Sequence, residues 1–230
     1  MVHFTLFGIP VYIRPSFWVV LAIFGGALSI SSVEDLIYPA LFVIAGFIAI
    51  LSHEMGHALV GRRLGGGQQT IVLELFGGLT SSHGMQLTRG GRALMILAGP
   101  MMTPPLGIIS LWLTWNIVAP VMASHNLDFW DLAISPFTAA LISPKLYILS
   151  CLIMIGEWWT LLNLLPIYPL DGGQLIAQYI RSPRKVFMTG FITAILIGLL
   201  SFQLFHGYFI PIFMALFAYS NYREYKNAPF

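Results

Sequence analysis

Charged residues are scarce in this sequence. Only 9% of its 230 residues are Asp, Glu, Lys or Arg, whereas 57% are hydrophobic. A soluble domain carries about 25% charged residues, so this composition excludes an ordinary soluble domain and predicts a multi-pass membrane protein. The net charge of +2 is too small to indicate a nucleic-acid partner.

Cysteine is almost absent, because Cys151 is the only one. A disulfide within the chain and a metal site built on cysteines are therefore excluded. The first 15 residues include Gly8, Pro10 and Pro15 but no basic n-region, so we expect no cleaved signal peptide. We find no internal repeat and no stretch long enough for a soluble accessory domain, and expect residues 1–230 to form one membrane domain.

Six apolar runs predict an all-α polytopic membrane protein with about six transmembrane helices. We expect a core at about residues 38–180 and peripheral helices at about 16–30 and 186–220. Pro100, Pro104 and Pro105 predict a kink or break in the third run. Between the second and third runs, residues 68–88 predict a small β-hairpin or loop that dips into the membrane, with an amphipathic surface hairpin as the alternative.

Basic residues gather on one side of this six-span arrangement. Only Lys145 falls on the other side, together with Glu34, Asp35, Asp128 and Asp131. The positive-inside rule then puts both termini in the cytoplasm. The ten residues that share the cytoplasmic side are Arg14, Arg62, Arg63, Arg89, Arg92, Arg181, Arg184, Lys185, Arg223 and Lys226.

Residues 53–57 form the pattern H-E-x-x-H within the second apolar run. On a helix His53 and His57 lie four residues apart, so both imidazoles point from one face and can bind one metal ion. The side chain of Glu54 lies about 100° round the helix from that of His53, which suits a base acting on metal-bound water better than a third ligand. Three such polar side chains are costly in a membrane span, which favours a functional site over a chance pattern.

The third ligand has to come from elsewhere in the chain. His125 and His206 fall on the opposite side of the membrane, and His3 belongs to the terminal arm. Asp171 is the best-placed carboxylate, because it lies on the same side as the two histidines. It follows the helix-ending Pro166, and Gly172 and Gly173 allow the backbone to turn tightly and point the carboxylate inward.

Two separated motifs carry a family resemblance. His53-Glu54-Met55-Gly56-His57, together with residues 163–172 in the pattern N-x-x-P-x-x-x-x-D-G, resembles the paired signature of the site-2 protease family of intramembrane zinc metalloproteases. The resemblance implies that His53, His57 and Asp171 bind one Zn²⁺ per chain, that Glu54 activates water, and that Asn163 helps to hold substrate. Thr103 replaces the asparagine that the family often has, which leaves its oxyanion role open.

The function implied by this resemblance is hydrolysis of peptide bonds in or near the transmembrane segments of single-span membrane proteins. We expect a prokaryotic cell membrane, a bilayer environment and a site that opens to the cytoplasm; the oligomeric state stays open. Our candidate for pairing with an unwound substrate strand is the stretch 71–78, in particular Ile71, Val72, Leu73, Gly77 and Gly78.

Two other functions stay open at this point. A membrane transporter or metal-handling protein would use the same ligands transiently, and a non-catalytic protease relative would only bind partner helices. Glu157, an ionisable residue within the fourth apolar run, has either a functional or a structural role, and we favour the structural one. His83 either lines a water path or is a solvated loop residue, which we favour.

Overall fold

The computed structural model describes residues 1–65, 67–75, 77–84, 86–125, 128–206 and 208–229, which form two compact units, Met1–Thr160 and Leu161–Phe230. The boundary between the units falls inside a helix. Within these residues the elements are β1 Val2–Leu6, β2 Ile9–Ile13, α1 Pro15–Phe24, the short 3₁₀ turns Ala27–Ser29 and Glu34–Leu36, α2 Ile37–Gly65, β3 Gln68–Glu74, β4 Gly77–His83, α3 Arg89–His125, α4 Phe129–Ile134, α5 Pro136–Ile142, α6 Pro144–Asn163, α7 Asp171–Ala177, α8 Pro183–Phe205 and α9 Phe209–Asn227.

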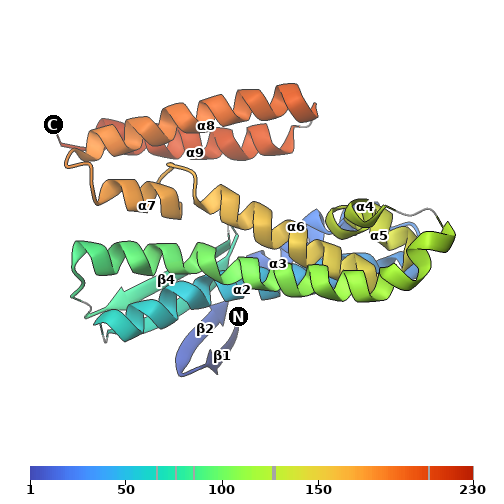
Figure 1. Cartoon of the computed structure of the whole chain (residues 1–230). Helices are drawn as coiled ribbons and strands as arrows, with labels where there is room; N and C mark the ends of the chain where they lie inside the picture. The colour runs from blue at the N-terminus through green and yellow to red at the C-terminus, as the bar shows by residue number, and fades with distance from the viewer. Residues whose placement is uncertain (66, 76, 85, 126–127, 207, 230) are drawn as a thin grey trace. The chain divides into compact units, whose positions relative to one another are not determined.

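A four-stranded sheet in the order β1-β2-β3-β4 belongs to the first unit (Figure 1). β1 and β2 form a hairpin whose two loop residues, Phe7 and Gly8, both have positive φ, as the tight turns that match strand twist require. β2 then pairs in parallel with β3, and β3 pairs antiparallel with β4. The expectation of a mostly helical membrane protein with a small β element after the second apolar run is therefore confirmed in outline, and the terminal arm adds two further strands to that element.

The sheet packs on the part of α2 that carries the H-E-x-x-H pattern. Alternate residues of β2 and β3 point to one face, as the period of a strand requires, and are almost fully buried against α1 and α2. The sheet therefore gives α2 a rigid neighbour beside the two histidines. The residues of this core are Ile9, Val11, Ile13, Phe17, Leu21, Ile50, Leu51, Met55, Ala58, Ile71 and Leu73.

Helix α3 is one continuous helix, so of the predicted kink or break at its prolines, the break does not occur. Pro104 has no N–H to donate to the carbonyl of Pro100, four residues earlier. The hydroxyl of Thr103 donates to that carbonyl instead, at 3.2 Å, and thereby restores one bond that the proline removes. The helix also packs tightly on α2, where a Cβ at Gly56 would lie 2.8 Å from the carbonyl carbon of Ala98.

The second unit consists of α7 and the helical hairpin of α8 and α9, which run side by side in orange and red in Figure 1. Its core contains Ile167, Ala194, Met214 and Ala218. The side-chain amide of Asn221 on α9 donates to the carbonyl of Tyr168 at 2.6 Å. This bond ties the loop before α7 to the hairpin.

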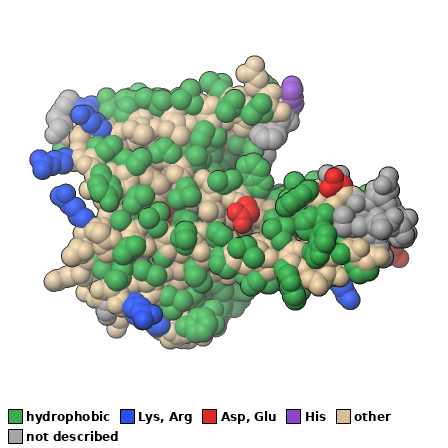
Figure 2. Space-filling view, in the orientation of Figure 1, with side chains coloured by type: hydrophobic (Ala, Val, Ile, Leu, Met, Phe, Trp, Pro, Cys, Tyr) green, Lys and Arg blue, Asp and Glu red, His purple; other side chains and the backbone are tan. Residues whose placement is uncertain are grey.

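Among the described residues, four helices are long and apolar enough to cross a membrane: Glu34–Gly65, Arg89–Pro120, Pro144–Asn163 and Pro183–Leu204. The predicted count of six is not confirmed. The first predicted span is only the ten-residue helix α1, which at about 1.5 Å per residue is half the thickness of the hydrocarbon core. In Figure 2, hydrophobic side chains cover α8, and Lys and Arg side chains gather where α8 begins, as expected for a helix that enters a bilayer.

Candidate metal centre

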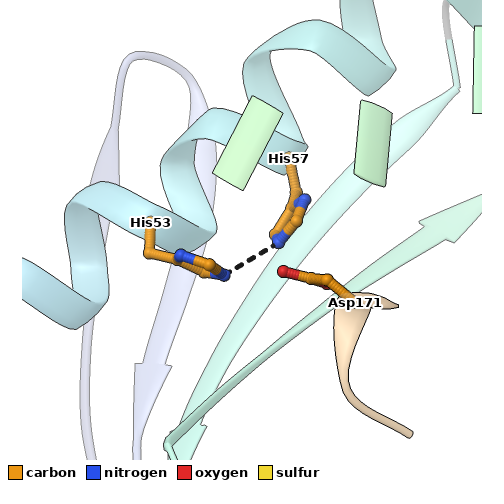
Figure 3. A group of neighbouring side chains, drawn as sticks. All are labelled: His53, His57 and Asp171. Carbon is orange, nitrogen blue, oxygen red and sulfur yellow. Dashed lines mark hydrogen bonds between the residues drawn. The ribbon is translucent and has the colours of Figure 1, made fainter. Parts of the chain in front are cut away.

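His53 and His57 lie on one face of α2, as their spacing predicts. Their side chains are 1% and 7% exposed, and their Nε2 atoms face each other at 3.2 Å (Figure 3). Two nitrogens bound tetrahedrally to one zinc, each about 2.0–2.1 Å from it, would lie about 3.3–3.4 Å apart. The two rings therefore already have the spacing that one shared cation needs.

The other ring nitrogen of His57 is held by α3. Nδ1 lies 2.8 Å from the carbonyl oxygen of Met95. Because a carbonyl only accepts, Nδ1 must carry the hydrogen, and in a neutral ring Nε2 then keeps its lone pair for a metal. The backbone of α3 thus fixes both the ring orientation and the tautomer of one candidate ligand.

Gly99 allows this contact. A Cβ at Gly99 would lie 2.8 Å from Cδ2 of His57, and still closer to Cε1 and Nε2. No ordinary side chain fits at that distance, so the ring packs directly on the helix backbone. From the sequence, Gly99 and Pro100 indicate only close packing; the partner of that packing is the candidate ligand itself.

The carboxylate of Glu54 faces strand β4. Glu54 is 5% exposed, and the hydroxyl of Thr80 donates to Oε2 at 2.8 Å and lies 3.2 Å from the backbone oxygen of Glu54. Gly78, two residues before Thr80, packs on the same side chain, because a Cβ there would lie 2.5 Å from Oε1. Thr80 is a site residue that sequence reasoning missed, since no motif signals a contact between a strand and this helix.

Asp171 is the first residue of α7 in the second unit and is 6% exposed. A Cβ at Gly172 would lie 2.5 Å from the carbonyl oxygen of Leu165, and one at Gly173 would lie 2.5 Å from that of Ile167. Both glycines lie within helix α7 rather than in a tight turn, and their missing side chains let the helix pack directly on the backbone of the preceding loop. All three candidate ligands, drawn in Figure 3, are buried, and two imidazoles with one carboxylate are a donor set that zinc takes in catalytic sites.

The other candidates have different surroundings. Asn163, at the end of α6, is 8% exposed. Thr103 is fully buried: its single hydroxyl hydrogen is donated to the carbonyl of Pro100, and its oxygen accepts from the hydroxyl of Thr160. That hydrogen is therefore engaged within the helix bundle rather than free to stabilise an oxyanion.

Strand β3 has no free edge for a substrate strand. Ile71, Val72 and Leu73 pair with β2 on one side and with β4 on the other. Their proposed pairing with substrate is therefore wrong in this structure; Phe76, at the end of the same stretch, lies outside the described residues. Gly77 and Gly78 belong to β4, the last strand of the sheet, whose outer edge has no strand neighbour among the residues described.

Glu157 and His83 were the two residues whose roles the sequence left open. Glu157 on α6 is half-buried, and its Oε1 packs on α3, where a Cβ at Gly107 would lie 2.7 Å away. His83 is exposed at the end of β4. A packed Glu157 agrees with the structural role that we favoured, and an exposed His83 agrees with a solvated residue.

Comparisons with known proteins agree on one family. The model of peptidase family M50 matches residues 41–205. Zinc metalloprotease MJ0392 of Methanocaldococcus jannaschii is 28% identical to this chain over 227 residues, which cover 94% of this chain and 57% of that protein. The putative zinc metalloprotease sll0528 of Synechocystis is 29% identical over 188 residues, which cover 76% of this chain and 43% of that protein. The chain thus spans about half the length of these curated relatives.

A solved structure has the same fold. The site-2 protease from Methanocaldococcus jannaschii superposes with a TM-score of 0.59 at 23% identity, over 97% of this chain and 94% of the other. The mostly helical architecture with its small sheet is therefore shared along nearly the whole chain.

Proposed function

Since this chain belongs to peptidase family M50, we propose that it is an intramembrane zinc metalloendopeptidase. The observation that carries this function is the His53–His57 pair, buried in an apolar helix with both Nε2 atoms at the spacing of zinc ligands. Such polar groups are expensive in a membrane span unless they serve a site.

His53, His57 and Asp171 would hold one zinc ion per chain. The support is their chemistry and burial, together with the bond from His57 Nδ1 to Met95, which places the ring hydrogen on Nδ1 and the lone pair on Nε2. Zinc supplies Lewis acidity, which polarises a carbonyl and makes water a better nucleophile near neutral pH.

Glu54 is the proposed general base. Glu54 belongs to the same turn of α2 as the two histidines, and in this role it would accept a proton from the attacking water and pass it to the nitrogen of the leaving amine. Burial keeps bulk water away and strengthens each of these polar interactions.

The substrates we propose are single-span membrane proteins. A helical segment hides its peptide bonds in its own hydrogen bonds, so it must unwind before cleavage, and unwound backbone in a membrane needs new partners. The free edge of β4, which includes Gly77 and Gly78, offers such partners beside Glu54. This edge takes the place of the β3 residues expected from the sequence.

The proposed location is the plasma membrane of a prokaryote, with both termini and the opening of the site on the cytoplasmic side. Basic residues lie at the ends of helices that would share that side: Arg62 and Arg63 near the end of α2, Arg89 and Arg92 at the start of α3, and Arg184 and Lys185 at the start of α8. This distribution supports the orientation through the positive-inside rule.

Glu54→Gln tests the proposal. Purified protein in lipid is assayed for zinc per chain and for cleavage of a single-span reporter. A protease keeps its zinc but loses about 10²–10⁴-fold in cleavage rate. Glu34→Gln, an exposed change far from α2's histidines, is the control and should leave both readings unchanged.

The alternatives give a different result. A metal-handling protein or a non-catalytic relative would function normally with the Glu54→Gln change. Zinc-loaded Glu54→Gln protein that cleaves the reporter at the wild-type rate would therefore refute the base role and the proposed protease mechanism.

A further inference from the structure

One face of strand β4 is directed at α2. Gly78, Thr80 and Ser82 are alternate residues of a strand and so share a face. Gly78 and Thr80 both contact Glu54, and Ser82 donates to the side chain of Gln69 at 2.6 Å. Gln69 in turn packs on α2, where a Cβ at Gly61 would lie 3.1 Å from its Oε1. The strand is thus aligned with the helix over three successive inward positions.

The two contacts with Glu54 restrict different motions. The terminal torsion of a glutamate side chain is soft, so a carboxylate without partners rotates over a broad range. The Thr80 hydroxyl donates to Oε2 and fixes the plane of the carboxylate, while the backbone at Gly78 blocks movement towards the strand.

We propose that Thr80 and Gly78 are positioning residues, through which β4 holds the Glu54 carboxylate in register with a substrate strand paired to its outer edge. The inference rests on the proposed function, because it assumes that Glu54 is the base. A single strand would then orient both the base and the peptide bond to be cut. This arrangement would set the position of cleavage by the register of the substrate on β4.

The test compares Thr80→Val, which keeps the shape but removes the donor, with Thr80→Ser, which keeps the donor. Thr70→Val is the matched control, because Thr70 is also a half-buried strand residue and its hydroxyl has no hydrogen bond among the described residues. Each full-length variant in lipid is measured for kcat, KM, bound zinc and thermal unfolding.

Thr80→Val should lower kcat by about ten- to hundredfold, the usual effect of losing one hydrogen bond to a charged group, with KM and zinc content unchanged. Thr80→Ser should restore kcat to within about threefold of wild type, because the donor is the part that matters. Thr70→Val should behave as wild type in all four measurements.

Three outcomes would overturn the positioning role. Thr80→Val could keep its kcat while Glu54→Gln is inactive, which would leave the base assignment intact. Thr80→Ser could fail as badly as Thr80→Val, or Thr80→Val could lose zinc, and either result would indicate packing instead. If Glu54→Gln itself is fully active, the proposed function fails, and that failure is separate from the role of Thr80.

Discussion

Replacement of Gly99 by alanine tests the metal centre without touching a candidate ligand. The new Cβ would lie 2.8 Å from Cδ2 of His57 and closer still to Nε2, whereas ordinary contacts of a Cβ begin near 3.4 Å. The distance from the new Cβ to Cδ2 of His57 is therefore 0.6 Å shorter than an ordinary contact. Zinc–nitrogen bonds hold their lengths to within about 0.2 Å, so a ring displaced by this amount is no longer a good ligand.

The size of the effect follows from the packing. Forcing an extra methyl group into a close-packed contact costs about 1–3 kcal/mol, and each 1.4 kcal/mol corresponds to a tenfold change in binding. If the ring yields, zinc affinity should fall by about five- to hundredfold. The hydrogen bond from His57 Nδ1 to Met95 would also be distorted, which adds to the loss.

Zinc affinity is measured by competition with a chelator on purified protein in lipid. Gly90→Ala is the matched control: Gly90 lies in the first turn of α3, with no atom within 4 Å of a new Cβ. It should leave zinc affinity unchanged, and thermal unfolding reports whether either variant disturbs the fold. Wild-type zinc affinity in a folded Gly99→Ala protein would refute the contact between α3 and the His57 ring.

Two further changes test roles inside the helix bundle. Glu157→Gln keeps the shape of a side chain that packs on Gly107, so cleavage rate and zinc content should stay within about twofold of wild type if the role is structural; a large loss of cleavage would indicate function. Thr103→Val removes the donor to the Pro100 carbonyl and should lower unfolding free energy by about 1–2 kcal/mol with normal zinc content, whereas Thr103→Ser should restore it. Unchanged stability in Thr103→Val would contradict that role.

Patterns local to the chain were predictable from sequence. The shared face of His53 and His57 needs only the period of a helix. The four long apolar helices follow from runs of about 20 residues. In each case neighbouring residues decide the geometry, so no knowledge of the tertiary structure is required.

Contacts between distant segments were not predictable in this way. β2 pairs with β3 across about 60 residues of chain, for example Val11 with Ile71. No short sequence pattern predicts a parallel pair of strands at that separation. The turn before β2 places Phe7 at a φ of 50°, where a non-glycine residue is uncommon. The terminal strands therefore could not be recognised, and with them the reason why β3 has no free edge.

Contacts between distant segments also explain which site residues could not be predicted from the sequence. Met95, Gly99 and Thr80 act on the site through a carbonyl, a missing side chain and a hydroxyl, none of which forms a motif. Their roles exist only because α3 and β4 pack on α2. A buried Glu and two buried His need such partners, so finding the motif implies that partners exist without saying which residues they are.

Through the sheet, the position of the Glu54 carboxylate also depends on the N-terminal strands. Thr80 holds Glu54 only while β4 keeps its place, and among the described residues β4 has one strand partner, β3. β3 is in turn fixed by β2, with the backbone N–H of Arg14 donating to the carbonyl of Leu73 at 2.9 Å. The alternate residues of both strands fill the core against α2. Residues 2–13, although distant from the motif in sequence, therefore belong to the framework that orients the proposed base.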